Sequence, residues 1–116
     1  MKELHLPHQE PIKFAKYILS KDENAALVRV EFENIPTLPM LIESAAQSSA
    51  ALSKDERKMG FLVSLKNIEL MQKPKVLSYD VKITKEHSFG NMTYIGFEVL
   101  DENAVIAKGS FVIALQ

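Results

Sequence analysis

The stretch that decides the fold runs from Thr37 to Leu52 and reads Thr-Leu-Pro-Met-Leu-Ile-Glu-Ser-Ala-Ala-Gln-Ser-Ser-Ala-Ala-Leu. It predicts a helix over residues 38–52, because threonine is a favoured N-cap and proline is tolerated in the first helical turn. Only Glu43 carries a charge, and the other side chains are small or apolar on every face. A helix that is apolar nearly all round is buried nearly all round. Its small residues predict close approach by a surrounding sheet.

Strand patterns flank this helix on both sides. In the segment before it, Ala26, Val28, Val30 and Phe32 alternate with outward-facing residues, which is the period of a strand with one buried face. Short, hairpin-length connections after the helix make the sheet antiparallel. The sequence therefore predicts an α+β protein, a single domain over residues 1–116, with one long antiparallel sheet wrapped around a central buried helix. The expected strands cover residues 13–21, 26–33, 61–70, 76–85, 91–100 and 104–115.

The composition and the charge of the chain argue against several classes of function. The 116 residues include 14 basic and 15 acidic side chains, and no basic patch of the kind a nucleic-acid binder needs. The absence of cysteine excludes a disulfide scaffold, a thiolate nucleophile and cysteine-based metal sites. There is no nucleotide-binding loop and no histidine cluster with metal-ligand spacing. With no secretory signal and no apolar run long enough to span a bilayer, we expect a cytoplasmic protein without nucleic-acid, membrane or metal partners.

Glu43 is the residue best placed to carry chemistry. Burying an ion without a partner is costly, so a lone carboxylate on an uncharged helix usually marks a pocket or a polar contact. Glu43 lies near the helix start, where the dipole favours negative charge and the backbone amides can polarise a carbonyl. Gln47 lies one turn later on the same face. A structural interpretation carries equal weight: Glu43 would complement the dipole, and Gln47 would tie the helix to a strand.

Three segments together resemble the 3-hydroxyacyl-(acyl carrier protein) dehydratases of the FabZ type. They are Leu6-Pro7-His8, the run from Pro36 to Gln47, and the strand from Phe61 to Asn67, in the family's order and over nearly the whole chain. In that family the chain opens with Leu-Pro-His-Arg, and a His-Phe-Pro segment leads through Met-Pro-Gly into a helix reading Glu-Ala-Met-Ala-Gln. The resemblance implies a hotdog fold, usually paired edge to edge as a dimer. It also implies an acyl chain on a phosphopantetheine thioester as substrate.

The resemblance assigns a role to each matched residue. In the family a histidine removes the α-proton and a glutamate protonates the leaving β-hydroxyl, the two coming from opposite subunits. Glu43 matches this acid, and Gln47 matches the helix glutamine. Pro39 and Met40 match the helix start that binds the thioester carbonyl, and His8 joins the substrate-binding positions, although the family keeps its motif mainly for structure. No cofactor is implied beyond the phosphopantetheine of an acyl carrier protein or coenzyme A thioester.

The chain departs from the family at the catalytic base. Asn34-Ile35-Pro36 stands where the family has His-Phe-Pro, so Asn34 occupies the base position, and an amide cannot take a proton at neutral pH. The glycine of the Met-Pro-Gly turn is also missing, and Gln9 replaces the arginine of the opening motif. For His5, His8 and His87 a surface or structural role is favoured, with His87 in an exposed turn over residues 85–88. These departures predict a diverged relative of the dehydratases.

Three functional hypotheses remain open. The first is an active thioester enzyme of the dehydratase or thioesterase type, in which Glu43 does the acid–base work with His8 or a partner's residue. As a dehydratase it would be a lyase that acts on 3-hydroxyacyl thioesters in fatty-acid or related lipid or polyene synthesis. The second is a non-catalytic module that binds an acyl carrier protein or its acyl chain, with a basic rim at Lys54, Arg57 and Lys58. In the third, the chain pairs with another hotdog subunit that supplies the missing histidine. Homodimer and heterodimer both remain possible.

Overall fold

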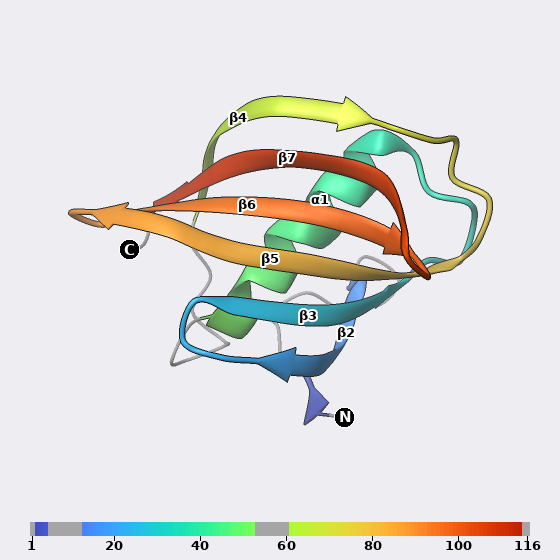
Figure 1. Ribbon diagram of the computed structural model, residues 1–116, viewed down its shortest axis with the longest axis horizontal. Helices are drawn as coiled ribbons and strands as arrows, with labels where there is room; N and C mark the ends of the chain where they lie inside the picture. Colours follow the sequence, from blue (N-terminus) through green and yellow to red (C-terminus); the bar gives the residue numbers. More distant parts are fainter. Residues whose placement is uncertain (1, 5–12, 53–60, 115–116) are drawn as a thin grey trace.

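The computed structural model describes residues 2–4, 13–52 and 61–114, and these form one curved antiparallel sheet around one helix (Figure 1). The strand order is β1-β2-β3-β5-β6-β7-β4, and every pair of neighbours is antiparallel. This confirms the architecture predicted from the sequence. The elements are β1 (Lys2–Glu3), β2 (Ala15–Lys21), β3 (Ala25–Glu31), α1 (Leu38–Ser48), a 3-10 turn η1 (Ser49–Leu52), β4 (Phe61–Leu70), β5 (Ser78–Phe89), β6 (Met92–Asp101) and β7 (Ala104–Ala114).

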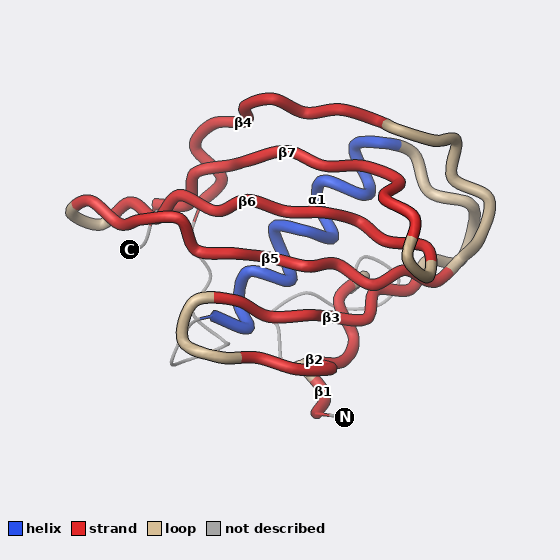
Figure 2. The backbone as a smooth tube through the Cα atoms, viewed as in Figure 1, coloured by secondary structure: helices blue, strands red, loops and turns tan. Residues whose placement is uncertain are grey.

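The core lies between the helix and the inner face of the sheet. The alternation predicted before the helix is confirmed, since Ala26, Val28 and Val30 of β3 are all buried. The helix contributes small side chains to this core, and Ala45 and Ala51 have no exposed surface at all. Small residues let the strands approach the helix axis closely, so the sheet wraps the helix rather than lying flat against it (Figure 2).

The ends of the helix differ in detail from the prediction. Thr37 is the N-cap residue in extended geometry, but its side chain makes no capping hydrogen bond, and its carbonyl oxygen accepts from the Leu41 amide at 3.0 Å. The last predicted turn is a 3-10 turn. At that end the Lys21 ammonium of β2 donates to the Ala51 carbonyl oxygen at 3.2 Å, which satisfies one of the free helix-end carbonyls.

The turn predicted over residues 85–88 is wrong. Strand β5 continues through His87 to Phe89, and the hairpin reverses at Gly90 and Asn91. Gly90 has a φ of 62°, which a two-residue hairpin turn requires and glycine adopts without strain. His87 is exposed, as expected, but it stacks on the Tyr94 ring of β6, with 4.2 Å between ring centroids. That cross-strand pair stabilises the strand geometry where the sequence suggested a turn.

Gly109 of β7 is required by packing. A Cβ atom there would lie 3.1 Å from the Ile68 Cα and 3.2 Å from the Phe97 ring. At Gly96 of β6 the nearest heavy atom would be 3.6 Å away, which is an ordinary contact.

We therefore predict that Gly109→Ala lowers the free energy of unfolding by about 1–3 kcal/mol through overpacking. The matched Gly96→Ala change should stay within about 0.5 kcal/mol of the wild type. Urea denaturation followed by circular dichroism measures both. Equal stability of the two variants would contradict the packing argument.

Candidate functional site

Gln47 joins the helix to the start of β2. Its side chain is completely buried, and its Oε1 atom accepts hydrogen bonds from the backbone amides of Phe14 at 2.8 Å and Ala15 at 3.2 Å. A carbonyl oxygen has two lone pairs, so these two donors saturate it. The Gln47 oxygen therefore plays the structural role suggested by the sequence, because it ties the helix to a strand.

The other end of the same amide faces the candidate acid. Gln47 Nε2 donates to Glu43 Oε1 at 3.3 Å, one helical turn earlier. Because the Gln47 oxygen is held by β2, its nitrogen is turned toward Glu43. The half-buried Glu43 carboxylate therefore has an orienting donor, and the structure brings together the two helix residues that the sequence singled out.

The serines of the helix are not available as reactive groups. Ser44 Oγ donates to the Leu41 carbonyl oxygen, and Ser48 Oγ donates to the Ser44 carbonyl oxygen, each at 2.7 Å. Both side chains are fully buried. Both hydroxyls use their hydrogen bonds within the helix. Glu43 and Gln47 are therefore the polar helix side chains considered for the site.

The helix start offers fewer donors than the resemblance implies. Pro39 is exposed and has no amide hydrogen, and the Leu41 amide already bonds to the Thr37 carbonyl oxygen. Of the first helical residues, Leu38 and Met40 carry the amides without an acceptor inside the helix. Those two amides are the hydrogen-bond donors available at the helix start, and Pro39 contributes none.

Asn34 lies outside the helix, in the segment between β3 and α1. The Asn34 side chain is exposed. Phe32, two residues earlier, is buried, and the backbone amide of Phe32 donates to the Leu77 carbonyl oxygen at 2.8 Å. The position matched to the family's base is therefore on the surface of this chain, and it carries a residue that cannot accept a proton.

Several predicted residues lie outside the described part of the chain. They are His5 and His8, and the basic rim Lys54, Arg57 and Lys58. Within residues 2–4, 13–52 and 61–114, no group of three acidic or histidine side chains is arranged to hold a metal ion. In the same residues, no helix has the length and apolar character needed to cross a membrane.

Strand β4 forms one edge of the sheet. It pairs with β7 on one side, and no other described strand pairs with it. Four of its apolar side chains are well exposed: Leu62 at 41%, Val63 at 53%, Leu65 at 45% and Leu70 at 45%. The pairing shifts register between Leu62 and Ser64 and again between Lys66 and Glu69. An edge strand with exposed apolar side chains is a place where a second chain can add.

The fold and the site define a hotdog-fold protein with an oriented carboxylate on its central helix. The structure is similar to the dehydratase heterocomplex ApeI:P from Xenorhabdus doucetiae, with a TM-score of 0.76 and 13% identity over 96% of this chain and 88% of that one. It also resembles a hypothetical thioesterase with coenzyme A from Streptococcus pneumoniae TIGR4, with a TM-score of 0.71 and 13% identity over 86% and 87% of the two chains. At these identities the likeness shows the fold alone.

A third similar structure is smu.793 from Streptococcus mutans UA159 bound to acetyl CoA, with a TM-score of 0.70 and 12% identity over 94% of this chain and 96% of that one. No protein-family model matches the sequence, and no curated protein is significantly similar to it.

Sequence reasoning found Glu43 and Gln47 but missed the backbone groups that hold them. The amides of Phe14 and Ala15 belong to a strand more than thirty residues away in sequence. The residues around Glu43 and Gln47 carry no signal that predicts this contact, because the start of any buried strand has backbone amides of this kind.

We predict that Gln47→Leu lowers the free energy of unfolding by roughly 2 kcal/mol or more, because the backbone amides of Phe14 and Ala15 at the start of β2 lose their buried acceptor. Gln72→Leu, at an exposed loop position, is the control and should change it by less than about 0.5 kcal/mol. Urea denaturation gives both values. A Gln47→Leu protein as stable as the control would show that the tie contributes nothing.

Proposed function

We propose that this chain binds acyl thioesters as one subunit of a two-subunit hotdog dehydratase, in which Glu43 is the general acid. The observation that carries the proposal is the Glu43 carboxylate, oriented by a glutamine that is itself anchored to β2. A glutamic acid side chain held in one position at the start of a buried helix is suited, in its protonated form, to giving a proton to a bound substrate.

The reaction needs a second group that this chain does not supply at the expected place. Dehydration of a 3-hydroxyacyl thioester moves the α-proton to a base, forms the α,β double bond, and releases the β-hydroxyl as water with a proton from the acid. Glu43 supplies the acid. Since Asn34 is an amide and cannot take the α-proton, we assign the base to the partner subunit.

The exposed edge of β4 supports a partner on that side. Leu62, Val63 and Leu65 present apolar surface that pairing would bury, and the helix lies behind the neighbouring strands (Figure 1). Two copies of this chain would place an asparagine at both base positions. A partner with a histidine there would complete one site, and the likeness to a dehydratase heterocomplex is consistent with such unequal pairing.

The substrate carrier follows from the same chemistry. The thioester carbonyl would accept hydrogen bonds from the Leu38 and Met40 amides at the helix start, with the phosphopantetheine arm leading out to an acyl carrier protein or to coenzyme A. Fatty-acid or related lipid and polyene synthesis supplies such 3-hydroxyacyl thioesters.

The first test is binding without turnover. We predict that the purified chain binds a 3-hydroxyacyl pantetheine thioester in a calorimetric titration but produces no 2-enoyl absorbance above background. Glu43→Gln should leave binding nearly unchanged. Turnover by the wild type that is lost in Glu43→Gln would instead establish a self-sufficient enzyme. A chain that does not bind the thioester would contradict the proposal.

The second test restores the base. We predict that Asn34→His raises the rate of 2-enoyl formation by about a hundredfold or more over the wild type, because a general base typically contributes that much. Adding Glu43→Gln to the Asn34→His chain should return the rate to background. Activity that persists in the doubly changed chain would show that Glu43 is not the acid.

A further inference from the structure

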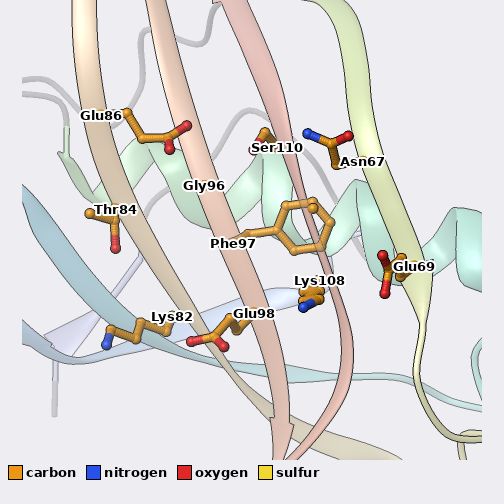
Figure 3. A pocket seen from close by; sticks show the side chains of 11 residues that line it. Asn67, Glu69, Lys82, Thr84, Glu86, Gly96, Phe97, Glu98, Lys108 and Ser110 are labelled. Carbon is orange, nitrogen blue, oxygen red and sulfur yellow. The ribbon is translucent and has the colours of Figure 1, made fainter.

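Two adjoining hollows lie on the outer face of the sheet, on the side away from α1 (Figure 3). Their volumes are about 450 and about 220 Å³, and strands β4, β5, β6 and β7 contribute to them. The charged side chains that line them are three glutamates and three lysines: Glu69, Glu86, Glu98, Lys66, Lys82 and Lys108. Because these charges balance, the lining selects neither an anion nor a cation. The distinctive property of this face is the order in which the charges follow one another.

Four of these charges form a row across the sheet. On β6, Glu98 has Lys82 of β5 and Lys108 of β7 as its register neighbours. Lys108 has Glu69 of β4 on its other side. Figure 3 shows the four side chains in this order across the strands, with the helix behind them. From β5 to β4 the signs therefore alternate as positive, negative, positive and negative.

No ion pair closes this row within the chain. Among residues 2–4, 13–52 and 61–114, none of the four side chains makes an ion pair or a hydrogen bond. Arg29 and Asp80 are register neighbours on the same face, and they do pair, with 2.6 Å between Arg29 Nε and Asp80 Oδ1. Three residues of the row are exposed and Glu98 is half-buried. The charged groups of the row are therefore available to another chain.

An alternating row with an even number of charges is complementary to its own reverse. A two-fold axis parallel to the strands, between β6 and β7, brings the outer faces of two copies together and reverses the order of the strands. Glu98 of each copy then faces Lys108 of the other, and Lys82 of each copy faces Glu69 of the other. Every contact in the row joins opposite charges, as an interface between identical surfaces requires.

The remaining pair of lining charges agrees with the same axis. Glu86 of β5 in one copy faces the β4 strand of the other copy, where Lys66 lies. The Glu86 carboxyl group reaches over β6, because its atoms lie 3.6–3.8 Å from the position that a Cβ atom of Gly96 would take. Gly96 and its register neighbour Ser110 are small, so the hollow leaves room for the two long side chains to meet.

An apolar pair lies on the other side of the charged row. Leu100 follows Glu98 on the same face of β6, and Val105 of β7 is the register neighbour of Leu100. Both side chains are half-buried, and neither belongs to the core under the sheet. The two-fold axis places Leu100 of each copy against Val105 of the other. Burial of these side chains favours association, while the charges fix its register.

We propose that the outer face of the sheet pairs two copies of this chain, as two stacked and aligned sheets. This pairing is independent of thioester binding, because Glu43 belongs to the helix on the opposite side of the sheet. It also leaves the backbone edge of β4 open to a hotdog partner.

The test is sedimentation velocity of the purified full chain, with the wild type compared with Glu98→Lys and Lys108→Glu. In either variant the two-fold axis brings like charges together twice, so we expect the dissociation constant to rise by about tenfold or more. At a concentration where the wild type is paired, the particle mass should fall by half. Glu31→Lys makes the same charge change at an exposed position of β3, outside the four strands, and should leave the mass unchanged.

The two variants then serve as partners for each other. An equal mixture of Glu98→Lys and Lys108→Glu should regain the wild-type mass, because each introduced charge faces an opposite charge on the other chain. Recovery on mixing also shows that neither variant lost its pairing through a folding defect. A wild-type mass equal to that of Glu98→Lys, or variants that stay apart when mixed, would overturn the proposal.

Discussion

A buried amide must find partners for both its oxygen and its nitrogen, and this constraint on Gln47 fixes how the helix lies in the sheet. The oxygen accepts from the amides of Phe14, just before β2, and of Ala15, its first residue, and the nitrogen donates to Glu43. Rotation of the helix about its axis would break both sets of bonds at once. The small residues that let the sheet close around the helix depend on the same orientation, because they must face the strands.

The sequence patterns were sufficient to predict the fold, but they did not predict all of its contacts. The alternation from Ala26 to Val30 and the uncharged helix were sufficient for a sheet wrapped around a helix, since period and burial are local properties. The end of β5 was not predicted, because polar residues around His87 resemble a turn while in fact they extend a hairpin past the core.

The candidate site was predictable in part for the same reason. The i, i+4 spacing of Glu43 and Gln47 places them on one face of any helix, so their contact follows from the sequence. The strand that anchors Gln47 is distant in the chain, and only the folded structure brings it there. Asn34 shows the limit of a family motif: the motif locates a position, while the chemistry depends on the residue found there.

The two register shifts in β4 have a consequence for how the protein behaves in a crowded solution. A flat edge strand with exposed leucine and valine can template the addition of almost any extended chain, which leads to aggregates. Here the regular ladder between the shifts is confined to Ser64, Leu65 and Lys66. A chain that joins this edge must match the bends on either side of those residues, so the edge admits a partner of complementary shape and resists indiscriminate growth.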